Sequence, residues 1–147
     1  MQEQGYEVII FDADMGFSNI EVLLGSRPKY HLSEMIHGRK SIWEVIHHTN
    51  EGIRLISGGS GLNELIHLNE AQMDYFIHQI QQLVGKTDFI LFETGAGLTK
   101  EAMKFIAAAD ETWIITTPEP TSVTDAYALI KLVCQAGLDT NFRLVIN

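Results

Sequence analysis

The chain has 147 residues, of which 46% are hydrophobic and 20% are charged, and it carries a formal net charge of −9. This length and composition fit one globular domain with a sizeable core. The negative charge argues against a general surface for nucleic acid or anionic membrane, but leaves a local basic patch open. A single cysteine, Cys134, excludes an internal disulfide and fits a reducing cytoplasm. No apolar run approaches the roughly 18 residues of a membrane span.

Short β-branched runs alternate with segments of helical period, a pattern typical of β-α units and a mainly parallel sheet. Strands are predicted at 8–11, 53–56, 89–92, 113–116 and 143–146, with two short helices at 32–36 and 42–46. The clearest amphipathic helix follows a predicted Asn69 cap. Its apolar residues have i, i+3, i+4 spacing and are Met73, Phe76, Ile77, Ile80, Leu83 and Val84. Val123, Ala126, Leu129, Ile130 and Val133 mark another helix, which Gly137 ends. Without a repeat or linker, the pattern predicts one α/β domain over residues 1–147.

Some conspicuous residues are better explained by packing than by chemistry. Trp43 and Trp113 lie in apolar runs and are predicted to be core residues, and Cys134 is predicted to be a small buried hydrophobe. The six histidines lack the paired spacing of a metal site.

Polar residues end several of the predicted strands: Asp12 and Asp14, Glu93, the turn at 118–120, and Asn147. The carboxyl ends of the strands form the ligand crevice of an open parallel sheet, so we expect these residues to line one site. Asp12 and Asp14 are two positions apart and should point to the same side, where they suit a hydrated Mg²⁺ or the orientation of a water. An Asp-rich turn that simply ends a strand is the alternative.

Glu93 is followed by a turn that contains Gly95 and Gly97, and Thr99 is a candidate cap for the next helix. An acid and a mobile loop occupy such a position in phosphoryl-transfer proteins, although an ordinary β-α loop has the same appearance. Together the three acids predict an acidic pocket for a metal ion that carries phosphate. The sequence has no Gly-x4-Gly-Lys-Ser/Thr motif, and the Gly-rich run 57–61 is predicted to be a flexible loop.

Three stretches, 8–19, 88–97 and 117–127, resemble the MinD/ParA group of deviant-Walker ATPases, and most closely the flagellar-number regulators of the FlhG (YlxH) type. They follow the family order over essentially the whole chain, and the last stretch is the most specific. The resemblance implies a P-loop NTPase fold that binds ATP or ADP with Mg²⁺.

Residue roles follow from this resemblance. Asp14 matches the acid that positions the attacking water, and Asp12 matches a neighbouring residue near the metal. Glu93 stands where the family normally has the Asp that contacts Mg²⁺ through water, so the longer side chain is a departure. The other implied nucleotide contacts are Gly16, Gly95, Gly97, Pro118, Glu119 and Asn147. A rigid turn explains Glu119 equally well.

The resemblance also implies a switch in which ATP joins two identical subunits and hydrolysis separates them. The implied partners are an FlhF-like GTPase and flagellar switch-complex proteins, without nucleic acid, in the cytoplasm or at the inner face of the cell membrane. The family's first strand, its phosphate loop and its membrane helix are not among these residues. We therefore expect a piece of a longer ATPase, Met1 being an internal or misassigned start, with unpaired strand edges inside its sheet and no ATP hydrolysis by itself.

Two other functions remain open. The absent phosphate loop and Glu93 favour a non-catalytic interaction module that has lost nucleotide binding. A division-site or plasmid-partition ATPase of the same family is the third possibility. Partition proteins need a basic surface for DNA, which a net charge of −9 makes less attractive.

Overall fold

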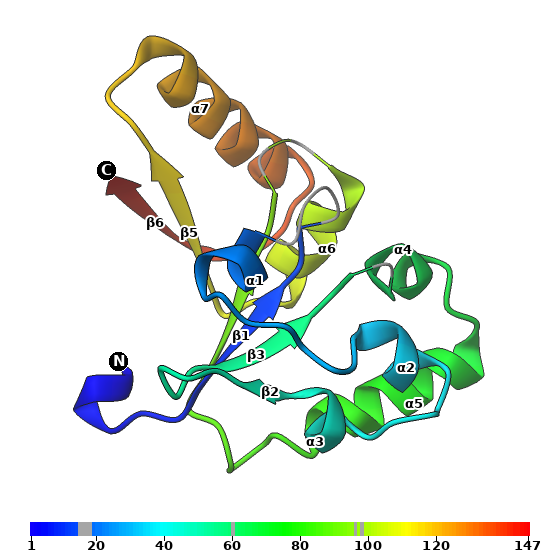
Figure 1. Cartoon of the computed structure of the whole chain (residues 1–147). Helices are drawn as coiled ribbons and strands as arrows, with labels where there is room; N and C mark the ends of the chain where they lie inside the picture. The colour runs from blue at the N-terminus through cyan, green and yellow to red at the C-terminus, as the bar shows by residue number, and fades with distance from the viewer. Residues whose placement is uncertain (15–18, 60, 96, 98) are drawn as a thin grey trace. The chain divides into compact units, whose positions relative to one another are not determined.

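The chain forms two compact units, each with its own sheet (Figure 1). The computed structural model describes residues 1–14, 19–59, 61–95, 97 and 99–147. The N-terminal unit is Met1–Gly95 and the C-terminal unit is Ala96–Asn147.

A four-stranded sheet in the order β2-β3-β1-β4 is the framework of the N-terminal unit. Its strands are β1 (Val8–Asp12), β2 (His47–His48), β3 (Arg54–Ser57) and β4 (Phe89–Glu93). The helices are the 3₁₀ turn η1 (Gln2–Gln4), α1 (Asn19–Leu23), α2 (Leu32–Ile36), α3 (Ile42–Val45), α4 (Gly61–Ile66) and α5 (Glu70–Gln81). Because β1 runs parallel to both β3 and β4, and only β2 is antiparallel, the predicted mainly parallel sheet is confirmed.

The core of this unit forms where the apolar strands meet the short helices. Ile9 and Phe11 of β1 are fully buried, as are Leu55 and Ile56 of β3, and the Phe11 ring lies 5.2 Å from that of Phe92 on β4. Other buried apolar residues of this unit include Leu32, Met35, Ile42, Val45 and Leu83. Burial of these side chains is the main favourable term in holding the sheet and helices together.

Side-chain hydrogen bonds fix α5 and the segment packed against it. Asn69 accepts a bond from the Gln72 amide at 2.9 Å, and Gln72 accepts one from the Asn69 amide at 3.1 Å, so the predicted cap is confirmed as a capping box. The buried Gln79 accepts a 2.8 Å bond from the Ile42 amide, and Trp43 Nε1 donates to Gln82 at 3.1 Å. These two bonds tie α3 to α5.

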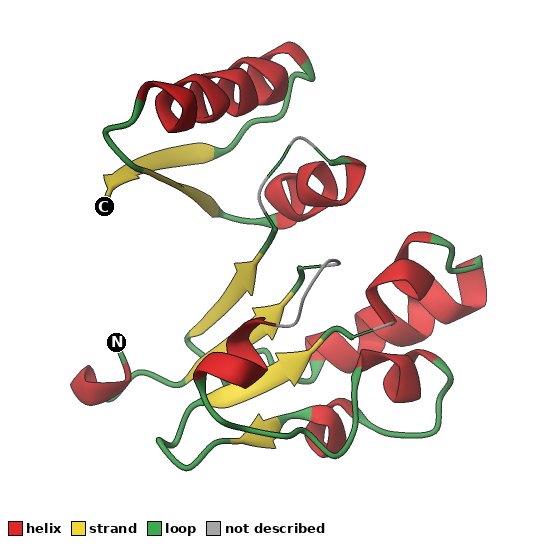
Figure 2. Cartoon of the chain, turned by 45° about the horizontal axis from the view of Figure 1, so that its top comes forward, coloured by secondary structure: helices red, strands yellow, loops and turns green. Residues whose placement is uncertain are grey.

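The C-terminal unit is built on two parallel strands, β5 (Glu111–Thr116) and β6 (Asn141–Ile146). Its helices are α6 (Lys100–Ala108) and α7 (Pro120–Gln135), and α7 lies alongside the two strands (Figure 2). The predicted Thr99 cap is confirmed by a 3.1 Å bond from the Ala102 amide. Gly137 follows α7 with φ 68°, which is the left-handed conformation that ends a helix.

The predicted burial of both tryptophans and of Cys134 is wrong. Trp113 is 56% exposed, because β5 buries Ile114 on one face and leaves Trp113 and Ile115 on the other. Trp43 is 38% exposed, with Lys86 Nζ 4.9 Å from its ring. Cys134 is exposed, although the neighbouring Val133 of α7 is buried. An apolar run thus predicted the element correctly but not which of its faces is covered.

Within the described residues, β4 and β5 are edge strands, each paired on one side. There, β4 pairs only with β1, and β5 pairs only with β6. Edge strands of this kind occur in every open sheet, so the expected gap inside the sheet stays a prediction. Among the described helices, none has the length and apolar character needed to cross a membrane.

Candidate functional site

Three strand ends meet at the carboxyl edge of the larger sheet. Asp12 at the end of β1 lies in register with Ser57 on β3 and with Glu93 on β4. The Ala13 amide donates to the Glu93 carbonyl at 2.7 Å, and the Gly58 amide donates to the Asp12 carbonyl at 3.1 Å. The Asp12 side chain is only 1% exposed. The main chain therefore fixes the acidic strand ends side by side.

Asp14 lies against the segment that follows β4. Its amide is 3.3 Å from Asp12 Oδ1, and a Cβ built on Gly95 would lie 2.7 Å from Asp14 Oδ1. A Cβ on Gly58 would lie 2.4 Å from the Asp12 carbonyl oxygen. Because such distances are too short for a side chain, glycine at 58 and 95 allows the loops to close around the two aspartates.

The electrostatics of this edge favour a cation. Partial burial raises the pKa of Glu93, and the negative charges of Asp12 and Asp14 raise it further. Carboxylate oxygens are the donors that Mg²⁺ prefers, and Mg²⁺ commonly keeps several waters while it binds one or two carboxylates. In the described part of the chain, no group of three or more His, Cys, Asp and Glu side chains is placed to hold a metal ion. Asp12 and Glu93, in register at the strand ends, are the carboxylates that could hold a cation here.

The other predicted contacts gather at the carboxyl ends of β5 and β6. The Asn147 amide donates to the Thr116 carbonyl at 2.9 Å, and Glu119 is the N-cap residue of α7, directly after Pro118. Ser122 supports this turn, because its Oγ lies 2.8 Å from Thr116 Oγ1 and accepts a 3.1 Å bond from the Thr117 amide. Pro118, Glu119 and Asn147 thus share one end of the C-terminal unit.

The structure divides the predicted site residues into two sets. Asp12, Asp14, Glu93 and Gly95 come together in the N-terminal unit, whereas Gly97, Pro118, Glu119 and Asn147 belong to the C-terminal unit. Gly97 has φ 124°, a conformation that favours glycine. Gly16 lies outside the described residues.

Sequence reasoning missed a polar cluster beside Asp12. Ser57 is fully buried, and its Oγ donates to Glu21 Oε1 of α1. His31 Nδ1 lies 3.0 Å from Ser57 Oγ. His31 Nδ1 is also 3.8 Å from Glu21 Oε1. The cluster ties α1 and the segment before α2 to the end of β3.

The signal for Ser57 was present in the sequence, since it is a polar residue at the end of an apolar strand, as Asp12 is. The run 57–61 was instead predicted to be a flexible loop, yet Ser57 is the last residue of β3 and Gly61 is the first of α4. Both partners contact the hydroxyl of a serine that is closed to solvent. This arrangement suits a structural link better than a nucleophile.

Sequence comparison finds curated relatives of this chain. The chain is 35% identical over its 147 residues to the antiactivator FleN of Pseudomonas aeruginosa, and covers 52% of it. It is 34% identical over 133 residues, 90% of this chain, to the flagellum site-determining protein YlxH of Helicobacter pylori, and covers 45% of it. The chain thus spans about half the length of these curated relatives. No protein-family model matches it.

Structure comparison finds cell-division ATPases. A chain of the MinC:MinD cell division protein complex from Aquifex aeolicus has a TM-score of 0.78 at 23% identity, with 99% of this chain and 57% of that chain covered. MinD from Pyrococcus horikoshii, complexed with Mg-ADP, has a TM-score of 0.67 at 24% identity, with coverages of 98% and 56%. The fold is therefore that of the MinD/ParA P-loop ATPases.

Proposed function

The chain belongs to the MinD/ParA group of ATPases, close to the FlhG type, and we propose that it is part of an ATP-dependent switch that regulates flagellar number and placement. The observation that carries the proposal is the register of Asp12 with Glu93, with Asp14 next to them. Carboxylates gathered at one strand end attract a cation, and a nucleotide-bound Mg²⁺ is one.

In this proposal each acid has its own task. Asp12 and Glu93 hold Mg²⁺, which when bound would offset the negative charge of the acids and of the phosphates. Asp14 orients the attacking water, and Gly95 keeps the neighbouring loop close to it. Glutamate is one methylene longer than the family's aspartate, so Glu93 would bring its carboxylate to the ion on a longer side chain.

The remaining roles belong to the parent protein. ATP joins two copies, hydrolysis separates them, and an FlhF-like GTPase and flagellar switch-complex proteins are the partners, at the cytoplasmic face of the cell membrane. Gly16, Gly95 and Gly97 belong to the segments that respond to the phosphates. Pro118, Glu119 and Asn147 contact the base and ribose.

Calorimetric titration of Mg-ATP into the purified chain tests the site, with circular dichroism to verify folding. We expect weak binding that requires Mg²⁺, because the carboxylates hold the cation but the chain contains no P-loop lysine motif. Asp12→Asn should abolish the heat of binding. Glu111→Gln, which changes an acid of the C-terminal unit, should leave it unchanged.

A folded chain that binds neither Mg-ATP nor Mg-ADP would overturn this nucleotide site. That result would favour a non-catalytic interaction module, for which Glu93 in place of aspartate is the specific observation. A division-site role in the same family would keep nucleotide binding. It would differ in partner, and loss of flagellar-number control on deletion of the gene separates the two roles.

A further inference from the structure

A basic patch stands out in this acidic chain. Four of its ten lysine and arginine residues lie within residues 27–40, a span that contains only one acidic residue, Glu34. The Glu34 carboxylate is engaged by the His31 amide at 2.8 Å. We define the basic patch as Arg27, Lys29, Tyr30, Arg39 and Lys40, which flank α2 on both sides.

Tyr30 is the centre of the basic patch. Lys29 Nζ lies 5.2 Å from the centroid of its ring, and Lys40 Nζ lies 4.4 Å from it. A ring attracts cations through its negative face, so it holds together two ammonium groups that would otherwise repel each other. The same two lysines lower the pKa of the Tyr30 hydroxyl. Residues on both sides of α2 therefore form one positively charged surface.

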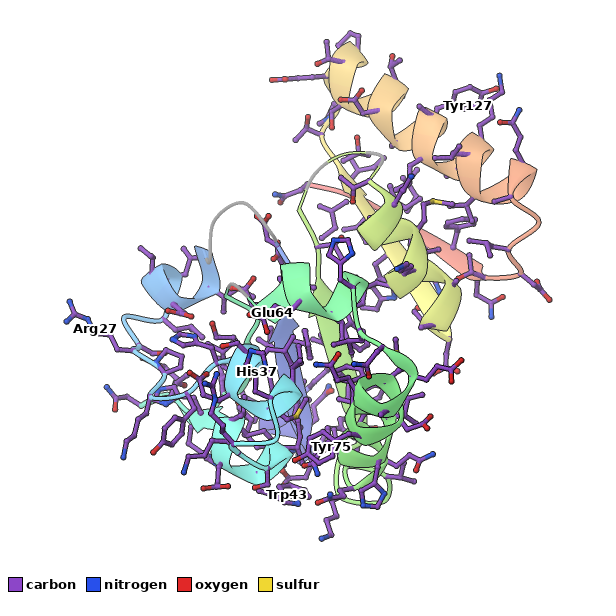
Figure 3. All side chains as sticks on the ribbon, turned by 90° about the vertical axis from the view of Figure 1, so that its right-hand side faces the viewer. Arg27, His37, Trp43, Glu64, Tyr75 and Tyr127 are labelled. Carbon is purple, nitrogen blue, oxygen red and sulfur yellow. The ribbon has the colours of Figure 1, made fainter. Side chains whose placement is uncertain are left out.

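The charge of the basic patch is only partly neutralised within the chain. Lys40 forms an ion pair with Glu44 at 2.8 Å. Arg27 and Arg39 are exposed and have no carboxylate partner among the described side chains, and Arg27 projects away from the ribbon in Figure 3. Guanidinium groups bind carboxylates through two parallel hydrogen bonds, so these arginines are suited to an acidic ligand.

We propose that the basic patch binds a short acidic peptide segment of a partner protein. Outside residues 27–40 the chain has 18 acidic residues and six lysines and arginines. A nucleic acid or an anionic bilayer would extend beyond the patch and meet this negative excess. A short peptide has fewer charges beyond the patch than either polyanion, so less of this negative excess repels it.

Fluorescence anisotropy of a labelled eight-residue peptide of alternating Asp and Glu tests the proposal. The double variant Arg27→Ala/Lys29→Ala should weaken binding about tenfold or more, because two exposed charge-assisted contacts are lost. Lys100→Ala/Lys104→Ala removes the same charge from α6 in the C-terminal unit and should leave binding unchanged. Tyr30→Leu keeps every charge but removes the ring, and we expect a several-fold loss.

Circular dichroism of each variant verifies that the chain is folded before binding is compared. Equal weakening by the two double variants would overturn the proposal, since it would reveal only a response to net charge. Tighter binding of an oligothymidylate of the same length, or of phosphatidylserine vesicles, would overturn it in favour of a polyanion. An alternating Asn-Gln peptide that binds as well as the acidic one would also count against it.

Discussion

The two units use their apolar residues in different ways. Strands and short helices of the N-terminal unit meet around fully buried residues such as Phe11, Leu32 and Leu55. In the described part of the C-terminal unit, the buried apolar residues are Ala102, Ile106, Ile114 and Val133, while Trp113, Ile115, Leu144 and Ile146 are more than half exposed. The strands of both units are rich in apolar residues. Those of the N-terminal unit form a filled core, whereas those of the C-terminal unit leave one face of their sheet exposed.

Truncation of one aromatic or aliphatic strand residue in each unit should give the largest contrast. Phe11→Ala should lower the free energy of unfolding by about 3–5 kcal/mol, because it leaves a cavity beside Phe92. Ile115→Ala removes a side chain that is 68% exposed and should change that free energy by less than about 0.5 kcal/mol. Urea unfolding followed by circular dichroism measures both. Equal losses would mean that the Ile115 face is covered in solution, and would break the comparison.

Removal of one serine hydroxyl from each unit should give a smaller contrast. Ser57→Ala leaves Glu21 and His31 without their shared partner and should cost about 1–3 kcal/mol of unfolding free energy. Ser122→Ala removes bonds to Thr116 and the Thr117 amide at a partly exposed turn, and about 0.5–1.5 kcal/mol is expected. The same urea titrations decide the order. A larger loss for Ser122→Ala would contradict the view that the N-terminal unit is the more tightly built.

Two glutamates should give the smallest effects, with opposite dependence on pH. The pKa of Glu93 is raised by burial and by Asp12 and Asp14, so its ionisation opposes folding as pH rises above the usual 4.5. The pKa of Glu111 is lowered by hydrogen bonds from Trp113 and Arg143, so its stabilising effect is present above 4.5 and is lost as pH falls.

Glu93→Gln should therefore raise the melting temperature at neutral pH, whereas Glu111→Gln should lower it. Both differences should shrink toward acidic pH, first for Glu93 and at lower pH for Glu111, and melting curves from about pH 2 to about pH 8 measure this. A decrease at neutral pH for Glu93→Gln would indicate that the carboxylate already has a positive partner, which would sharpen the search for a bound cation.

Local sequence patterns predicted where the strands and helices lie. They did not predict which distant parts of the chain cover or contact them. The β-branched runs that predicted β1 and β4, and the cap at Asn69, depend on neighbouring residues and were confirmed. The exposure of Trp113 depends on what covers β5, which no local pattern records. Likewise, Ser57 meets Glu21 and His31 across 36 and 26 positions of the chain.

For the candidate site as well, the sequence predicted the residues at the strand ends but missed a contact between distant residues. The rule that polar residues end parallel strands brought Asp12, Asp14 and Glu93 together, because parallel register places strand ends at one edge. The same rule placed Pro118, Glu119 and Asn147 at the ends of β5 and β6. It did not reveal that Gly95 contacts Asp14, because a missing side chain leaves no chemical signature in the sequence.

The two tryptophans make each unit optically visible by itself. Trp43 belongs to the N-terminal unit and Trp113 to the C-terminal unit, and the chain contains no other indole. In Trp113→Phe the emission comes from α3 alone, and in Trp43→Phe it comes from β5 alone. The pair of single-tryptophan proteins therefore reports whether the two units melt together or one after the other, without any added label.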